Sequence, residues 1–195
     1  MTAAILLASG LSRRLGTDKL TLEYKNKPLA VCAIEAIKNA CADERIIVTN
    51  NPRLAKHVAG FFVVPNPDAE EGKASAIRAG VLSAAADARY IFLVADQPFV
   101  TAEIIDGMIA LSERNPDKII VCGAQGRRGN PVLFPNAYRD RLLALSGDAG
   151  GRALISQKNS MEYAVPAEVL FDVDTAEDYE TLDLLTVTVT RSSSA

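Results

Sequence analysis

Short, continuously apolar segments alternate with segments of helical spacing along most of this chain. The apolar runs lack polar alternation, as strands buried on both faces do, and they cover residues 3–8, 45–49, 61–64, 90–95 and 118–122. The intervening segments place apolar residues three or four positions apart, which predicts helices over 28–40, 51–59, 74–86 and 101–114. This alternation predicts an α/β fold in which a mostly parallel sheet carries helices on both faces.

The last third of the chain is less regular but continues the same theme. We expect short strands at 130–134 and 161–165 and helices at 136–145, 151–157 and 176–185. Neither an internal repeat nor a low-complexity block interrupts the pattern. The chain therefore reads as a single domain over 1–186, followed by a flexible tail at 187–195.

Composition narrows the classes of function. The 195 residues carry a formal charge of −3, which argues against nonspecific binding to nucleic acid. No apolar run approaches the roughly 18 residues of a membrane span, and the N-terminus lacks the layout of a signal peptide. Cys32, Cys41 and Cys122 show no CxxC spacing, which favours reduced thiols and a cytoplasmic location over a zinc site or disulfides.

The first loop, after the strand at 3–8, is rich in glycine and positive charge. It is not the phosphate loop of ATPases, because Gly10 and Gly16 are six positions apart and Lys19 does not follow the second glycine directly. It is not the dinucleotide fingerprint either, because Ser12 stands where that pattern needs a glycine. Backbone N–H groups together with Arg13, Arg14 and Lys19 suit a polyphosphate; the alternative is a basic loop that meets only solvent.

Three carboxylates follow strand-like segments. Asp96 closes the apolar run at 90–95 and suits a Mg²⁺ ion held beside phosphates, or else a turn or helix cap. Asp172 and Asp174 share one face of an extended segment by their spacing of two. One of these two aspartates can complete a metal site with Asp96. The alternative is that Asp174 or Thr175 caps the helix that follows, since TAED has the form of a capping box.

The stretch from 66 to 80 begins as a polar loop and continues as an alanine-rich helix. The N–H groups at the start of that helix, together with Ser75 and Arg78, can meet a nucleotide base or ribose. The alternative is a solvated loop before a helix that packs through its alanines.

Taken together, these motifs resemble those of the MobA-like nucleotidyltransferases. Residues 7–19 read LASGLSRRLGTDK and are similar to the family pattern L-A-A-G-x-S-x-R-M-G-x-x-K, with Ser9 for Ala and Leu15 for Met. NKPL at 26–29, LVADQPFV at 93–100 and FDVDTAEDY at 171–179 resemble further family motifs. GRRGNPVLF at 126–134 and GDAGGRALI at 147–155 resemble the stretches that shape the acceptor side.

The helix near residue 74 favours one branch of the family, the molybdenum cofactor cytidylyltransferases. That branch carries E-G-M-S-S-S-L-R-A-G where this chain reads EGKASAIRAG over 71–80, and the G-P-L-A-G of the guanylyl branch is absent. CTP is therefore favoured over GTP. Ala74 and Ala76 replace two family serines, which leaves Ser75 for a base contact.

The resemblance implies a three-layer α/β/α Rossmann-like nucleotidyltransferase fold and an activity of class EC 2.7.7. A CMP group, or less favourably GMP, would move from the nucleoside triphosphate to the terminal phosphate of molybdopterin, with release of pyrophosphate. The implied cofactor is Mg²⁺. The implied partners are CTP or GTP, molybdopterin, and a molybdenum hydroxylase or its chaperone, with no nucleic acid and no membrane.

The resemblance also assigns residues to roles. The catalytic residues it implies are Arg14, Lys19 and Asp96. The nucleotide-binding residues it implies are Leu7, Ala8, Ser9, Gly10, Ser12, Arg13, Gly72, Ser75 and Arg78. It assigns the metal to Asp96 and Asp174, and the acceptor to Arg128, Asn130 and Asp148.

Two other functions stay open at this point. The first is nucleotidyl transfer to another small phosphate, such as methylerythritol phosphate, phospholactate or a sugar phosphate. The second is a noncatalytic carrier or insertion chaperone for the molybdenum cofactor, suggested by the alanines at 74 and 76.

Overall fold

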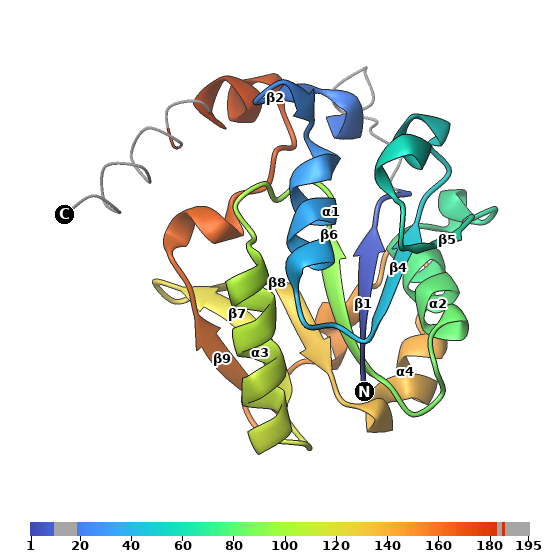
Figure 1. The fold of residues 1–195 in the computed structure, drawn as a ribbon. Coiled ribbons are helices and arrows are strands. Elements are labelled where there is room, and N and C mark those ends of the chain that lie inside the picture. The colour runs from blue at the N-terminus through green and yellow to red at the C-terminus, as the bar shows by residue number, and fades with distance from the viewer. Residues whose placement is uncertain (10–18, 183–184, 186–195) are drawn as a thin grey trace.

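The computed structural model describes residues 1–9, 19–182 and 185, and it describes Lys19 by its backbone alone. Seven strands of these residues form one sheet in the order β5-β4-β1-β6-β8-β7-β9 (Figure 1). The strands are β1 (Thr2–Leu7), β4 (Glu44–Val48), β5 (Phe62–Val64), β6 (Arg89–Val94), β7 (Ile119–Ala124), β8 (Arg127–Phe134) and β9 (Ser160–Ala164). Every pairing is parallel except those of β8, so the predicted mostly parallel sheet is confirmed.

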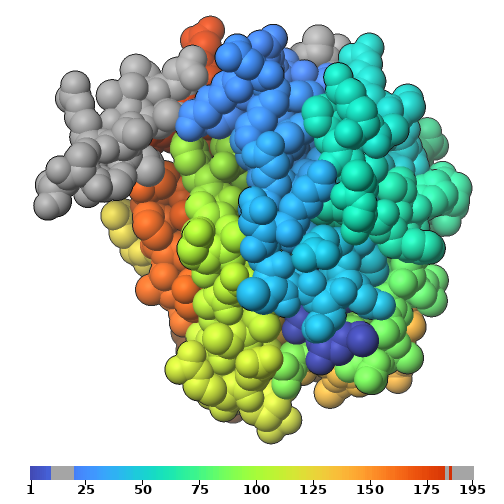
Figure 2. Space-filling view, viewed as in Figure 1, coloured from blue at the N-terminus to red at the C-terminus, as the bar shows by residue number. Residues whose placement is uncertain are grey.

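Helices cover both faces of the sheet. On one face lie α1 (Ala30–Asn39) and α3 (Ala102–Arg114), which pack side by side in front of the central strands in the space-filling view (Figure 2). On the other face lie α2 (Lys73–Ser83) and α4 (Arg139–Leu143). The α/β/α layering expected from the sequence is confirmed.

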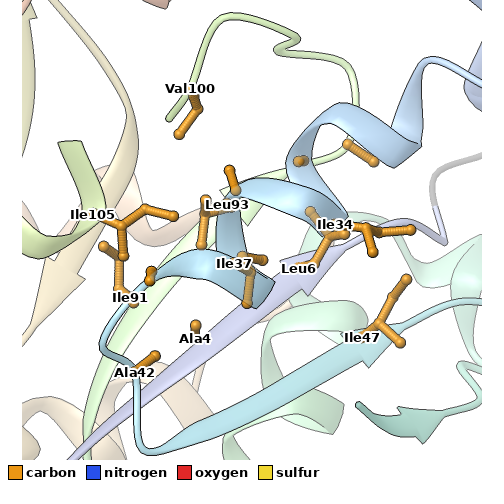
Figure 3. Packing of buried hydrophobic residues seen from close by; sticks show 14 of the residues in the cluster. Ala4, Leu6, Ile34, Ile37, Ala42, Ile47, Ile91, Leu93, Val100 and Ile105 are labelled. Atoms are coloured by element: carbon orange, nitrogen blue, oxygen red, sulfur yellow. The ribbon is translucent and has the colours of Figure 1, made fainter. Parts of the chain in front are cut away.

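Alternate residues of the central strands supply the two cores. Leu6 of β1 and Leu93 of β6 face α1 and α3, where they pack with Ile37 (Figure 3). Their chain neighbours Ile5 and Phe92 face α2 instead. Because successive side chains of a strand point to opposite faces, a strand buried on both faces must be apolar throughout, as the sequence pattern indicated.

The segment before α1 differs from the prediction. Pro28 was expected in the first turn of that helix, but it pairs in the short strand β3 (Lys27–Pro28) with β2 (Glu23–Tyr24). The turn between these strands has positive φ angles at Lys25 (52°) and Asn26 (62°), as tight hairpin turns require. Because the hairpin includes Pro28, the helix begins at Ala30, two residues later than predicted.

The strand predicted at 130–134 is longer than expected and runs antiparallel. It is β8, and it joins β7 through a tight turn at Gln125 and Gly126, both with positive φ. Val121 pairs with Val132 whereas Cys122 pairs with Gly129, so Asn130 and Pro131 bulge out of the ladder. Proline cannot donate a ladder hydrogen bond, which explains an irregularity at this point.

Several predicted helices are shorter than expected or are single 3₁₀ turns. Residues 51–59 contain η2 (Pro52–His57), 136–145 contain η4 (Asn136–Tyr138) followed by α4, and 151–157 contain η5 (Gly151–Leu154). The helix expected at 176–185 is helical at each of its described positions, 176–182 and 185, and the tail at 187–195 lies outside the described residues. No helix in the described part of the chain combines the length and hydropathy that a membrane crossing requires.

The cysteines differ in their surroundings. Cys122 is buried in the sheet, Cys32 is half-buried on α1, and Cys41 is exposed. Burial raises the pKa of the Cys122 thiol to about 12, so it stays protonated and packs as an apolar group.

We predict that Leu93→Ala lowers the free energy of unfolding by about 2–5 kcal/mol, because it leaves a cavity in the core beneath α1 and α3. The matched control is Leu82→Ala on α2. Leu82 is 65% exposed whereas Leu93 is 1% exposed, so the control should change stability by less than about 0.5 kcal/mol. Urea unfolding followed by circular dichroism measures both, and equal losses would contradict the assignment of Leu93 to the core.

Candidate functional site

A cleft of about 1160 Å³ opens at the carboxyl ends of β1 and β6. Its wall also includes the start of α2, the beginning of β8 and the loop before η5. The predicted site residues that line it are Leu7, Ala8, Ser9, Gly72, Asp96, Arg128, Asn130, Asp148 and Asp174. Segments up to about 170 positions apart in the sequence thus meet in one cavity, as expected for the carboxyl edge of a parallel sheet.

The register of β1 and β6 brings the first two predicted motifs together. Leu7 pairs with Val94, so Ser9 and Asp96 leave the sheet beside each other two residues later. The backbone of Ala8 is fixed on its other side, since its N–H donates to Val48 O at 2.9 Å and its carbonyl accepts from Thr49 Oγ1 at 3.0 Å. The end of β1 is therefore held rigidly at the cleft.

The acidic segment at 171–174 lies next to Asp96. The N–H of Val173 donates to the Asp96 carbonyl at 3.1 Å, and the Val173 side chain is buried with Tyr24 and Leu29. Anchoring of Val173 leaves its neighbours Asp172 and Asp174 facing the cleft, which they both line. The predicted shared face of these two aspartates is present.

The alternative roles of Asp174 and Thr175 can now be separated. The Thr175 hydroxyl accepts from the N–H of Asp178 at 3.1 Å and donates to Asp178 Oδ2 at 2.8 Å. The same carboxylate oxygen accepts from the N–H groups of Asp174 (3.0 Å) and Thr175 (2.8 Å). Thr175 and Asp178 form the capping box, so the helix cap does not require the Asp174 carboxylate.

Asp96 and Asp174, the predicted metal ligands, both line the cleft. Within residues 1–9, 19–182 and 185, no group of three or more His, Cys, Asp or Glu side chains is placed to hold a metal ion. Mg²⁺, however, is often bound by one or two carboxylates, with substrate phosphates and water supplying the other ligands. Two carboxylates on one cleft are compatible in number with an ion that shares its ligands with a bound polyphosphate.

The start of α2 touches the loop at 147–148. Gly72 precedes the helix with φ of 101°, and a Cβ there would lie 2.4 Å from Asp148 Oδ1 and 2.8 Å from the Gly147 carbonyl. The N–H of Ala74 donates to the Gly147 carbonyl at 3.1 Å. The predicted nucleotide side and the predicted acceptor side are thus in direct contact.

Ser75 and Arg78 differ from the other described residues of the predicted nucleotide site, because neither lines the cleft. The Ser75 hydroxyl is buried and donates to the Gly72 carbonyl at 2.8 Å. The Arg78 guanidinium donates to the Leu145 carbonyl at 2.9 Å and to Glu71 Oε2 at 2.6 Å. Their polar atoms bond to residues that form the wall of the cleft.

The acceptor side carries more positive charge than predicted. The Arg128 guanidinium donates to Ser160 Oγ at 3.2 Å and pairs with Glu162 at 3.4 Å, so β9 partly occupies it. Arg127 and Arg152 also line the cleft, and neither side chain hydrogen-bonds to another described residue. The bulge in β8 places Asn130 on this side of the cleft.

Asn66 and Gln97 also line the cleft but were not among the predicted site residues. Both are almost fully buried. The Gln97 side-chain carbonyl has no hydrogen-bond partner among the described residues. Each lies shortly after the carboxyl end of an apolar strand. The same position in the sequence identified Asp96 as a candidate.

The positively charged side chains predicted for the first loop lie outside the part of the chain that the structure describes. Gly10, Ser12, Arg13 and Arg14 lie outside the described residues, and so does the Lys19 side chain.

We predict that Gly72→Ala loosens the contact between α2 and the loop at 147–148. Gly60→Ala is the control, because Gly60 also has a positive φ (84°) but has open space around its Cβ position. The clash at Gly72 should cost about 1–3 kcal/mol of stability beyond the control. Hydrogen exchange at the Ala74 amide should accelerate only in Gly72→Ala, and equal exchange in both variants would contradict this contact.

Comparison with known proteins places this site in a family. Residues 4–162 match the MobA-like NTP transferase domain. The purine catabolism protein PucB of Bacillus subtilis is 26% identical over 194 residues, spanning 90% of this chain and 93% of that protein. The molybdenum cofactor guanylyltransferase of Syntrophotalea carbinolica is 28% identical over 193 residues, spanning 91% and 89%.

Solved structures agree with this assignment. Rv0371c from Mycobacterium tuberculosis H37Rv has a TM-score of 0.84 and 28% identity, covering 93% of this chain and 96% of that one. A second structure of that protein, described as a complex with manganese, has a TM-score of 0.77 and 25% identity, covering 93% and 97%. The chain belongs to the MobA-like NTP transferase family and is a nucleotidyltransferase of class EC 2.7.7.

Proposed function

We propose that this protein transfers a CMP group from CTP to the terminal phosphate of molybdopterin and releases pyrophosphate. The observation that carries the proposal is that one cleft joins the ends of β1 and β6 and the acidic segment to the positively charged start of β8. Two phosphate-bearing substrates need such a cleft, because the attacking and the attacked phosphates must meet within it.

The chemistry is an in-line displacement at phosphorus. A phosphate oxygen of the acceptor attacks the α-phosphorus of CTP, a new P–O bond forms, and the bond to the bridging oxygen breaks. Pyrophosphate leaves with the electron pair of that bond. Because the acceptor phosphate is already ionised near neutral pH, no general base or covalent enzyme intermediate is required.

Asp96 and Asp174 are the proposed ligands of Mg²⁺, and their shared position on the cleft supports this role. The manganese complex of the mycobacterial relative is consistent with a divalent cation. When bound, the ion would offset the negative charge of the triphosphate. Arg14, Lys19 and the backbone N–H groups of 8–10 are proposed to neutralise the same charge from the first loop.

The acceptor is assigned to the other half of the cleft. Asn130 and Asp148 line the cleft, and Arg127 and Arg152 line it as well and offer guanidinium groups in addition to the partly occupied Arg128. Guanidinium groups suit phosphate because they donate two parallel hydrogen bonds. A molybdenum hydroxylase or its chaperone is the proposed recipient of the product.

CTP is our first choice of nucleotide because residues 71–80 follow the cytidylyl pattern and lack the guanylyl one. GTP is the second candidate, since the relative from Syntrophotalea carbinolica is named a guanylyltransferase. With Ser75 buried, the choice between them rests on other groups of the wall.

The nucleotide and the acceptor are identified by one assay. Pyrophosphate release is measured with CTP, GTP, ATP and UTP, each with and without molybdopterin, in the presence of Mg²⁺. We expect release with CTP that depends on molybdopterin. Release with molybdopterin replaced by a methylerythritol or sugar phosphate would overturn the acceptor, and molybdopterin binding without any release would indicate a carrier.

We predict that Asp96→Asn and Asp96→Ala each lower turnover by at least about a hundredfold. Each variant loses a proposed ligand of the Mg²⁺ ion, which would offset the negative charge of the triphosphate. Lys19→Ala should do the same. The control is Asp87→Asn, at the opposite end of β6 and exposed to solvent, which should leave turnover unchanged. Unchanged pyrophosphate release by a folded Asp96→Ala variant would refute the metal role.

A further inference from the structure

A chain of hydrogen bonds runs from the start of α2 to the end of β1. The Ser75 hydroxyl donates to the Gly72 carbonyl at 2.8 Å, and Asn66 Nδ2 lies 3.0 Å from Ser75 Oγ. The same Nδ2 lies 3.0 Å from Ser9 Oγ. All three side chains are almost fully buried, and two of them, Ser9 and Asn66, line the cleft.

The direction of each bond in this chain is determined by its first member. A carbonyl can only accept, so the Ser75 proton is used on Gly72 and the Ser75 oxygen must accept from Asn66. This orients the Asn66 amide with its NH₂ group toward the serines. The second N–H of that group then donates to Ser9, so the Ser9 oxygen is an acceptor within the protein.

The Ser9 proton is consequently directed away from Asn66. Within the described residues the Ser9 hydroxyl has no hydrogen-bond acceptor. The backbone around it is fixed by the bonds of Ala8 to Val48 and Thr49, so the side chain has little freedom to turn elsewhere. A donor held in this way on a cleft wall suits an oxygen atom of a ligand.

We propose that Asn66 and Ser75 are positioning residues that direct the Ser9 proton to an oxygen of the bound nucleotide. The inference rests on the proposed binding of a nucleoside triphosphate in this cleft, and it deepens that function. It also gives a role to Ser9, a residue at which this chain differs from the family pattern, which has alanine at that position. Ser75 acts at a distance, since it does not line the cleft.

The test is equilibrium binding of CTP and of GTP with Mg²⁺, measured by calorimetry without any acceptor substrate. Ser9→Ala should weaken binding about three- to tenfold, the range for loss of one hydrogen bond between neutral groups, and more if the partner is a phosphate. Ser75→Ala should also weaken binding at least threefold, because the Asn66 amide is then free to turn over. The double variant should bind no more weakly than Ser9→Ala.

The control is Ser83→Ala, on the same helix, whose hydroxyl donates to the Ala79 carbonyl at 2.9 Å. It should bind the nucleotide as the wild type does. Asn66→Ala is a second route if Ser75→Ala fails to fold, because the pairing of Asn66 with Asn50 uses the backbone of Asn66 and is retained. It too should weaken binding only when Ser9 is present.

A folded Ser75→Ala or Asn66→Ala variant that binds within twofold of the wild type would overturn the proposal, as would additive effects with Ser9→Ala.

Inorganic tripolyphosphate, used as a second probe, identifies the ligand oxygen that accepts the Ser9 proton. Equal weakening for tripolyphosphate and CTP would assign the Ser9 proton to a phosphate, and weakening for CTP alone would assign it to the nucleoside. If the wild type binds no nucleoside triphosphate, the proposed function fails; if it binds and turns over while Ser75→Ala is unaffected, only this inference fails.

Discussion

The parallel pairing of β1 with β6 is the constraint on which the site depends. Its register carries the backbone after Leu7 and the backbone after Val94 out of the sheet at one edge. Hydrogen bonds to Val48, Thr49 and Val173 then fix these two ends from either side. Ser9 and Asp96 each lie within two residues of a strand end, so the sheet rather than a long loop positions their backbone.

The second half of the cleft is joined to the first through α2. The contact of Gly72 with the loop at 147–148 and the bonds of Arg78 to Glu71 and Leu145 connect the two halves. These contacts involve backbone atoms and a partly buried guanidinium, so they resist small displacements. The side chains that were expected to read the nucleotide thus act as the support of the wall that surrounds it.

Much of the fold could be predicted because burial on both faces leaves a continuous apolar run, as in β1 and β6. Asp96, Asp172 and Asp174 could be placed because strand ends and a spacing of two are local signals. The partners of Asn66 and Arg78 could not, since they lie as far as 57 and 67 positions away in the sequence. The hairpin before α1 was missed because Lys25, unlike glycine, gives no sign of a positive φ.

The antiparallel β8 has an evolutionary consequence. It brings acceptor-side residues to the cleft from a tight hairpin, and Gly126 at the hairpin tip has open space around it. Changes in length or sequence at such a tip leave the strand pairs that hold Asp96 intact. Changes at this tip can therefore reshape one wall of the cleft while the pairing of β1 with β6 stays the same.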